Sequence, residues 1–524
     1  MKKILLYISI FFGLTACSDD FLDRDPLDKL SNGSFWTNEN DALVAVNACY
    51  AKLDDDAYHS LYMDCASDNA YNQFTWDGYT AIGNGSFSPT DNVDRFDFTI
   101  IRRCNSILEN IEKISMDETL KKRLKGETRF MRAYSYFWMT QLYGDVPLVT
   151  TVLDLKDSDV ERAPRATVVE FLLKELGEIA ADLPLDYSGD NVGRATRGAA
   201  LSLKARIELY EGKFSEAANT AKQVMDLGVY DLFPDYVGLF TEENENNQEV
   251  IFDVQYIQDD YASWIQGSFA PNGDGGWSSV TPIQSLVDAY ECLDGKTIEE
   301  SALYDVDQPY KNRDPRLDAT VLYPGAEWEK RFFNPLDPSS PDHYLGNNTS
   351  KTGYNSKKYI YPLSSFANIW NNGMNVILMR YAEVLLIYAE AKVEAGQIDQ
   401  SVYDALNAIR TRAGMPDVDQ ATYSGQASLR QLIRRERRVE LAMEGFRWFD
   451  IVRWKTAETV MNKPVMGVRN GTVNPTTGEV TFTSDDHIKV EDRKFDPTKN
   501  YLWPVPQADI DATKNPKLKQ NPNY

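Results

Sequence analysis

Apolar residues recur every three to four positions through much of the N-terminal half of the chain, which is the spacing of an amphipathic α-helix. Residues 41–53 show this pattern, with one apolar stripe formed by Leu43, Val46, Tyr50 and Leu53. The same spacing predicts further helices over residues 93–114, 118–143, 167–182, 196–211 and 214–227. This part of the chain is therefore expected to be mainly helical.

Two segments have the small-residue pattern of tetratricopeptide-like helix pairs. The first pair carries Ala205, Gly212, Phe214, Ala217 and Ala221 at the spacing of such a repeat. Small side chains let two antiparallel helices approach closely, and a glycine between them permits the turn. A second pair is predicted over residues 376–395 and 401–413, with Gly396 at the position after a helix that favours a left-handed residue. One more helix is predicted over residues 428–444.

Residues 228–372 lack a helical period and are rich in Gly, Pro, Asn, Asp, Tyr and Trp. We expect a long irregular region with short strands here, and so long a region usually carries function. Residues 464–500 also favour turns, with Thr477 and Gly478 between two possible strands. The predicted fold is mainly α, with tetratricopeptide-like helix pairs and one large loop-and-short-strand region on the ligand side. A single domain is predicted over 17–524, divided into 17–227, 228–372 and 373–524.

The first residues have the pattern of a bacterial lipoprotein signal. Lys2 and Lys3 precede an apolar run over residues 4–16, which is too short to span a hydrocarbon core that needs about 20 residues. The run ends in Leu-Thr-Ala-Cys at residues 14–17, which resembles a lipobox. Residues 1–16 are therefore predicted to be a signal peptide, and Cys17 the lipidated first residue of the mature chain, attached to the membrane through its lipid. An ordinary secretory peptide is the alternative.

Charge and motif content exclude several classes of function. Lys and Arg total 55 against 79 Asp and Glu, a net charge of −24 that repels polyanions and disfavours nucleic acid as a partner. The three histidines, His59, His343 and His487, are far apart in the chain and offer little for a metal site or a triad. No nucleophile elbow, zinc-protease, P-loop or dinucleotide motif occurs. We therefore predict no catalytic residue, no cofactor and no metal site.

The cysteines after residue 17 are Cys49, Cys65, Cys104 and Cys292. Their wide spacing argues against a zinc site. Buried free thiols are the favoured interpretation, and a disulfide in an oxidising compartment is the alternative.

Two charged runs are explained without a ligand. Asp54, Asp55 and Asp56 lack the alternating spacing of a calcium loop and are expected in a solvated turn. The mixture of arginines and glutamates over residues 434–440 favours ion pairs on one helix over polyanion binding.

The strongest functional signal is the density of aromatic residues in polar loops. A sugar ring has C–H groups on its faces and hydroxyls at its rim, so it suits flat aromatic rings flanked by polar side chains. The predicted platform is formed by Trp76, Trp264 and Trp277. Candidate hydrogen-bonding or flanking residues are Asn69, Asn72, Asp77, Tyr261 and Asn272. The alternative is that these rings only pack their loops onto the helices, as is expected for Trp36, Trp138, Trp370, Trp448, Trp454 and Trp503.

Several segments resemble the SusD/RagB family of nutrient-binding outer-membrane lipoproteins of Bacteroidetes. The first is C-S-D-D-F-L-D at residues 17–23, whose acidic start is similar to a surface-export signal of lipoproteins in that group. The others are E-x-R-F-x-R-A-Y (127–134), L-Y-G-D-V-P (142–147), N-R-D-P-R (312–316), R-Y-A-E-V-L-L-I-Y-A-E-A (380–391), E-R-R-x-E-L-A-x-E-G (436–445), R-W-F-D (447–450), L-W-P-x-P (502–506) and N-P-N-Y (521–524). The resemblance extends from residue 17 to the last.

The resemblance implies a lipid-anchored protein at the cell surface that binds a glycan and delivers it to a SusC-like TonB-dependent outer-membrane transporter without cleaving it. Related proteins bind starch, xylan, fructans, xyloglucan, host glycans or other nutrients through aromatic residues in regions that correspond to about 68–79 and 256–280. The motifs identify the scaffold, so the backbone sugar, linkage and length of the glycan stay open. The alternatives are a surface glycoside hydrolase, a lipoprotein that only caps the barrel, and a binder of a non-glycan nutrient such as a peptide.

Overall fold

The computed structural model describes residues 35–91, 93, 95–157, 159–513 and 517–524. The predicted signal peptide and Cys17 lie outside these residues.

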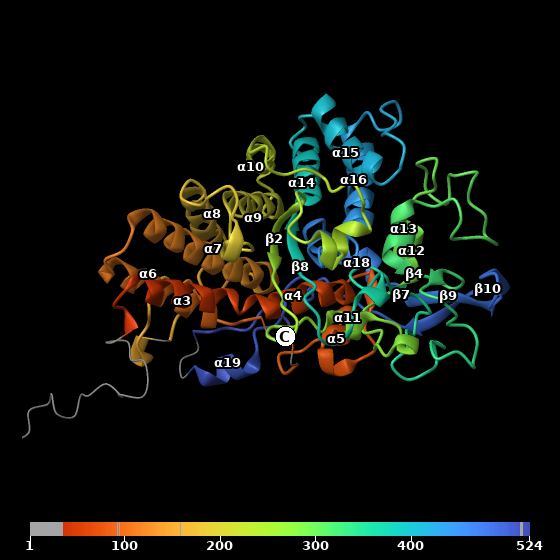
Figure 1. Ribbon diagram of the computed structural model, residues 1–524, viewed down its shortest axis with the longest axis horizontal. Helices are drawn as coiled ribbons and strands as arrows, with labels where there is room; N and C mark the ends of the chain where they lie inside the picture. Colours follow the sequence, from red (N-terminus) through yellow and green to blue (C-terminus); the bar gives the residue numbers. More distant parts are fainter. Residues whose placement is uncertain (1–34, 92, 94, 158, 514–516) are drawn as a thin grey trace, which may run out of the picture.

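Helices make up most of the N-terminal half, and the majority of them lie on the left of the view in Figure 1, with the helices of residues 53–84 nearer its centre. The helices of this half are α3 (Glu39–Tyr50), α4 (Leu53–Tyr62), α5 (Tyr79–Asn84), α6 (Thr99–Asn110), α7 (Glu118–Tyr143), α8 (Arg165–Ile179), α9 (Arg197–Tyr210) and α10 (Phe214–Asp226). For α7 to α10, the predicted first residue of each helix differs from the observed one by at most two residues, and the predicted last residue by at most three. The helix expected from residue 93 begins only at Thr99.

The run of three aspartates is in a helix, so the prediction of a solvated turn was wrong. Asp54, Asp55 and Asp56 form the first turn of α4, where carboxylates interact favourably with the helix dipole. Asp56 is buried and pairs with Arg95. The expected helix over 41–53 is therefore α3, followed by a second helix that the sequence pattern had not separated.

Both predicted helix pairs are present. The first is α9 and α10, joined at Gly212 with a φ of +70°, and α10 also packs against α14 (Tyr381–Glu394). The second is α14 and α15 (Gln400–Arg412), joined through Gly396 with a φ of +71°. The remaining helices of this part are α16 (Gln426–Glu440), α17 (Arg447–Arg453), α18 (Ala457–Val460) and α19 (Gln507–Ala512).

One end of the second pair was assigned incorrectly. Val376–Arg380 forms strand β8, which pairs antiparallel with β2 (Val250–Val254), and α14 starts only at Tyr381. All five residues of β8 are buried. A short apolar run buried on both sides has no alternation, so its sequence pattern does not distinguish a strand from a helix.

The region over 228–372 is irregular and contains short elements, as predicted. They are β2, α11 (Ile265–Phe269), β3 (Thr281–Pro282), α12 (Gln284–Ala289), α13 (Pro315–Thr320), β4 (Val321–Leu322), β5 (Glu327–Trp328), β6 (Arg331–Phe332) and β7 (Asn355–Ser356). Strand β1 (Ala70–Tyr71) pairs with β3, so the loop around residue 70 joins this region. The predicted C-terminal strands form a hairpin of β9 (Val465–Val473) and β10 (Val480–Glu491), on the right in Figure 1.

Buried ion pairs connect the helices of the C-terminal part. Arg380 donates hydrogen bonds to Glu249, Glu440 and Glu444 over 2.6 to 2.8 Å. Arg316 of α13 pairs with Glu436 and Glu440 of α16, so this charged run forms ion pairs as predicted, although these pairs join two helices and do not lie on one. Burial alone would raise the pKa of Glu440, but the arginines around it hold that pKa well below its usual range.

The four cysteines of the described chain are free and buried, which confirms the favoured interpretation. Cys49 on α3 and Cys104 on α6 lie closest to each other, with their sulfur atoms 3.9 Å apart. Within the described ranges, no helix has the length and apolar character needed to cross a membrane.

Candidate functional site

Buried charges hold the base of the aromatic loop, which we define as residues 68–79. The Asp68 carboxylate accepts hydrogen bonds from Nε and Nη2 of Arg447 at 2.7 and 2.9 Å, and it also pairs with Arg438. Nearby, Asp64 accepts a hydrogen bond from the backbone N–H of Gly445 at 2.9 Å. The start of the loop is thereby attached to the segment that connects α16 and α17.

Asn69 and Asn72 maintain the shape of the loop and are not presented at its surface, contrary to the expectation that they flank a ligand. Both are only 1% exposed. The amide of Asn69 donates to Asp64 and accepts from Arg438, each at 2.9 Å. Asn72 donates to Asp77 at 2.8 Å and accepts from the backbone N–H of residue 74 at 2.6 Å. We therefore leave both out of the binding surface considered below.

Two of the three predicted tryptophans belong to one cluster of rings, which we call the aromatic cluster: Phe74, Trp76, Trp277 and Trp370. Phe74 stacks on Trp76 with ring centroids 4.5 Å apart and meets Trp277 edge-on at 6.2 Å. Trp76 is 62% exposed and Trp277 is 42% exposed. Gln73 also donates to the backbone carbonyl of Trp277 at 3.1 Å, so the two loops are joined directly.

Trp370 is the member that the sequence interpretation missed, because it was expected in the core. Its ring is only partly buried and lies 4.8 Å from that of Trp277. Beneath it is Gly267, where a Cβ atom would be 2.2 Å from Cδ2 of the indole. The polar sequence Trp-Asn-Asn-Gly at 370–373 was the signal for a surface loop. Of the other tryptophans assigned to packing, Trp138, Trp448 and Trp503 are buried, and Trp36 and Trp454 are partly buried.

Trp264 lies behind the aromatic loop. Its ring is partly buried and packs 5.5 Å from that of Tyr58 on α4. The hydroxyl of Tyr58 donates to the Asp77 carboxylate at 3.2 Å. Burial raises the pKa of Asp77, and the hydrogen bonds from Asn72 and Tyr58 partly offset this effect. Trp264 and Asp77 thus support the loop from its α4 side.

The remaining predicted residues, Tyr261 and Asn272, are in different places. Tyr261 is 38% exposed, stacks on Tyr256 and donates to the carbonyl of Ala51 at 2.9 Å. It lines a separate pocket of about 360 Å³ beside the end of α3. Asn272 is partly buried next to the aromatic cluster, in the short helix η9 (Asn272–Asp274), and donates to the carbonyl of Pro341 at 3.0 Å.

Arg331, which contacts the short helix that contains Asn272, is neutralised by its neighbours. Arg331 donates to both oxygens of Asp274 at 2.7 and 2.9 Å and to Asp342 at 2.8 Å. These hydrogen bonds raise the pKa of Arg331 further above its usual value. Trp328 also donates its indole N–H to Asp274 at 2.7 Å. The positive charge of Arg331 is therefore already paired and is not available to an anionic ligand on this side of the cluster.

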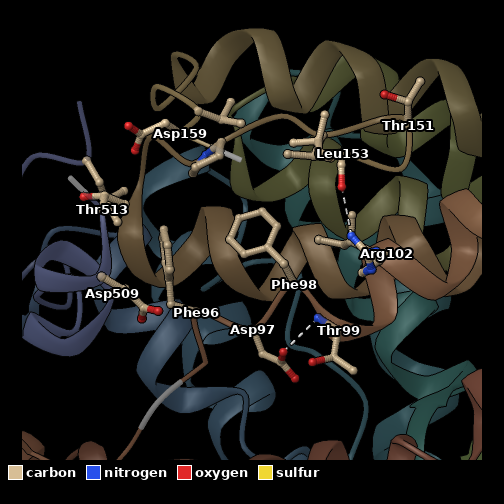
Figure 2. A pocket seen from close by; sticks show the side chains of 16 residues that line it. Phe96, Asp97, Phe98, Thr99, Arg102, Thr151, Leu153, Asp159, Asp509 and Thr513 are labelled. Carbon is tan, nitrogen blue, oxygen red and sulfur yellow. Dashed lines mark hydrogen bonds between the residues drawn. The ribbon is translucent and has the colours of Figure 1, made fainter. Parts of the chain in front are cut away.

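A larger cavity of about 670 Å³ lies between the start of α6, residues 147–153 with 159–160, and α19. Figure 2 shows Phe96, Phe98 and Leu153 on its walls with Asp97, Asp159 and Asp509 around them. Arg102 donates to the carbonyl of Leu153 at 3.1 Å. None of the residues predicted for the site lines this cavity. Among the residues that the structure describes, no group of three His, Cys, Asp or Glu is placed to hold a metal ion.

Comparison with known proteins identifies the family. The model of the SusD family matches residues 248–524, and a model described as starch-binding and associating with the outer membrane matches residues 20–209. The chain belongs to the SusD family. The sequence resemblance and the predicted fold class are thereby confirmed.

Relatives within the SusD family cover nearly the whole chain. SusD-like protein P2 of Formosa agariphila is 26% identical over the full length of both chains. The starch-binding protein SusD of Bacteroides thetaiotaomicron is 24% identical over 81% of this chain and 76% of its own. A crystal structure of a SusD-like carbohydrate-binding protein from Bacteroides fragilis has a TM-score of 0.80 and 29% identity, and covers 93% of this chain and 100% of that one. Two of these relatives are thus described as starch-binding or carbohydrate-binding, and one matching family model as associating with the outer membrane.

Proposed function

We propose that this protein binds a neutral oligo- or polysaccharide at the aromatic cluster, at the cell surface, and delivers it to a SusC-like TonB-dependent transporter. The observation that supports the binding role most is the pair of exposed indoles, Trp76 and Trp277, held on either side of Phe74. Sugar rings place their C–H faces on such rings, and rim hydroxyls bond to polar groups nearby. The relatives described as starch-binding and carbohydrate-binding agree with this role.

Charge favours a neutral glycan over a sulfated or uronic-acid polymer. Carboxylates near the aromatic cluster include Asp77, Asp274 and Asp342, and Arg331 is already paired with two of them. An anionic chain would meet these acids beside an Arg331 that is already paired, and against a net charge of −24. We therefore expect acidic glycans to bind more weakly than neutral glycans of the same length.

The binding role is tested with a panel of soluble polysaccharides in native affinity gels, followed by calorimetry with oligosaccharides. The panel includes starch, laminarin, xylan, fructan and xyloglucan. Losing one indole removes the burial of a sugar face, which contributes on the order of 1–3 kcal/mol, so Trp76→Ala or Trp277→Ala should weaken binding about tenfold. Val44→Ala is the control, because Val44 is an exposed apolar residue on α3, away from the cluster.

Unchanged affinity in both tryptophan variants, with circular dichroism showing intact folding, would rule out the aromatic cluster as the site. If no polysaccharide of the panel retards the protein in the gel, but the protein still associates with its barrel, the result would favour the capping role. If the protein binds a peptide and no glycan, the result would favour a binder of a non-glycan nutrient. Release of reducing sugar from any polysaccharide would instead support a glycoside hydrolase, whereas we propose that the protein is not an enzyme.

We also propose that Cys17 carries the lipid anchor. The supporting observation is the Leu-Thr-Ala-Cys sequence that ends the apolar run. Cys17→Ala should leave the chain unprocessed or released from the membrane fraction, because the acyl chains supply the attachment. Normal fractionation and surface labelling of this variant would contradict the assignment.

The SusC-like transporter is proposed as the partner because a bound glycan still has to cross the outer membrane. A protein held by lipid at the surface can concentrate a glycan, but moving it across the outer membrane requires a channel. Helical repeats offer a broad, rigid surface for docking to such a barrel. Mild detergent extraction should recover one barrel protein with this chain in equal amounts. Recovery only as a free monomer, under conditions that keep comparable pairs together, would refute this part of the proposal.

A further inference from the structure

The Tyr261 pocket, lined in part by Tyr261, Asn47, Asp190, Val192 and Gln255, is separate from the aromatic cluster. We propose that it is a second sugar subsite, which binds an outlying unit of the same neutral glycan chain. This inference rests on the proposed glycan-binding function and adds that the ligand is a chain of several sugar units.

The ring of Tyr261 is held rigidly in the wall of this pocket. One face stacks on Tyr256, with the centroids 5.7 Å apart and the planes 16° from parallel. The two hydroxyls are also fixed, because Tyr261 donates to the carbonyl of Ala51 at 2.9 Å and Tyr256 donates to Asp54 at 2.7 Å. Tyr256 is 6% exposed, whereas Tyr261 is 38% exposed. A ring fixed in this way costs little conformational entropy when a sugar packs against its exposed part.

The polar groups of the pocket suit hydroxyls. Both amide hydrogens of Gln255 are used by Asn246 and Asp253, which leaves its carbonyl oxygen as an acceptor. The carbonyl oxygen of Asn47 accepts from Arg194, which leaves its N–H₂ group as a donor. Asp190 is exposed and supplies acceptors. A sugar hydroxyl both donates and accepts, so it can bond to each of these groups.

The one arginine in the pocket does not attract an anion. Arg194 donates to the buried carboxylate of Glu127 at 2.9 Å and to Asn47 at 2.7 Å, and it lies over the ring of Tyr50. The other charged groups among the lining residues, Asp190 and Asp253, are acids. The pocket is therefore suited to a neutral ligand, as is the aromatic cluster.

A continuous line of contacts connects the pocket with the cluster. Tyr261 pairs with Ile257 through their backbones, and in the same turn Asp259 exchanges two hydrogen bonds with the side chain of Asn371. Asn371 directly follows Trp370, which contacts Trp277. Ile257, at the centre of this path, is 63% exposed. Tyr261 of the pocket and Trp277 and Trp370 of the cluster are thus on neighbouring segments of the same irregular region.

The two sites are attached to different positions, one just before the start of α4 and one on that helix. Tyr261 bonds to residue 51, just before α4, and Tyr58 on α4 bonds to Asp77 beside Trp76. Residues 53–58 of α4 lie between these two bonds, and at 1.5 Å per helical residue this part of the helix alone is about 8 Å long. One sugar ring is too short for that distance, so a ligand that occupies both sites needs several units.

The test measures affinity by calorimetry along series of neutral oligosaccharides, from disaccharide to octasaccharide, prepared from starch, laminarin, xylan, fructan and xyloglucan. Tyr261→Ala should weaken binding of the longer members by about fivefold or more and leave the shortest binding members unchanged. Trp277→Ala should weaken all members alike. Tyr261→Phe keeps the ring and should bind like wild type.

A second variant tests the pocket without altering Tyr261. Val192 is 38% exposed, so Val192→Trp should fill the pocket without disturbing the core, and it should reproduce the loss for long members only. An equal loss at all lengths, or no loss in either variant while Trp277→Ala is impaired, would overturn the second subsite and leave the proposed function intact. Failure of the wild-type protein to bind every series would overturn both.

Discussion

Replacing Gly267 by alanine should disrupt the aromatic cluster without removing any of its rings. Gly267 lies under the indole of Trp370, and a Cβ atom there would be 2.2 Å from Cδ2 and 2.5 Å from Cε2 and Cε3. Carbon atoms in contact are normally about 3.5–4.0 Å apart, so the indole would have to retreat by more than about 1.3 Å. The backbone at this position cannot yield easily, because Gly267 donates to Ile369 at 2.8 Å and accepts from Trp277 at 3.0 Å.

The expected cost of Gly267→Ala is about 1–3 kcal/mol in the free energy of unfolding, as for other overpacked sites. Displacement of Trp370 from Trp277 should also change the near-ultraviolet circular dichroism of the indoles and weaken glycan binding. Gly425→Ala is the matched control, because Gly425 has an ordinary φ of −112° and a Cβ atom added there would meet no atom within 4 Å. A Gly267→Ala protein with unchanged dichroism, stability and affinity would refute the assigned contact between Gly267 and Trp370.

Other predictions concern the scaffold. Arg380→Met leaves three buried carboxylates without their shared partner and should lower the free energy of unfolding by about 3–5 kcal/mol in urea titrations. The control is Arg430→Met, at a partly exposed ion pair, which should lower it by about 1 kcal/mol or less. Equal losses would contradict the role of the buried network. Burial alone would raise the pKa of Asp68, but Arg438 and Arg447 hold that pKa well below its usual value. The contribution of Asp68 to stability is therefore present above the pKa of about 3.9 that the group has in the unfolded chain. This contribution is lost as the pH falls below that value. The stability difference between wild type and Asp68→Asn should therefore narrow in acid, and a constant difference would argue against this ion pair. The four buried cysteines should react with a thiol reagent after unfolding without prior reduction, and peptide mass spectrometry that finds any of them in a disulfide would contradict the free-thiol structure.

The helical scaffold was predictable from the sequence because its signals are local. A stripe of apolar residues at helical spacing specifies a helix such as α7 wherever the rest of the chain lies. Strand β8 escaped detection because its stability depends on pairing with β2, which lies far away in the sequence. The helix break before Leu53 was also hidden, because the apolar spacing continues across it.

The site was only partly predictable, because aromatic loops do not indicate which of their residues face solvent. The composition correctly pointed to the loops of Trp76 and Trp277, which the structure brings together. Asn69 looks like a ligand contact in sequence, yet it is buried and its partner Arg438 is far away in the chain. The same limit applies to Trp370, which joins the cluster through a contact with a distant loop. Such long-range contacts leave no periodic signal.

The attachment of Asp68 to Arg447 and of Asp64 to Gly445 has a consequence for engineering. The start of the aromatic loop is fixed by charged groups that belong to the scaffold, and its end leads into α5, where Gly83 packs against the carbonyl of Cys65. Residues 72–78 between these two points are the part to exchange as a cassette, because Ala70 and Tyr71 pair with β3 and Tyr79 is buried. Transplanting these residues from a relative with a known ligand would offer a direct route to altered glycan preference, with the helical framework unchanged.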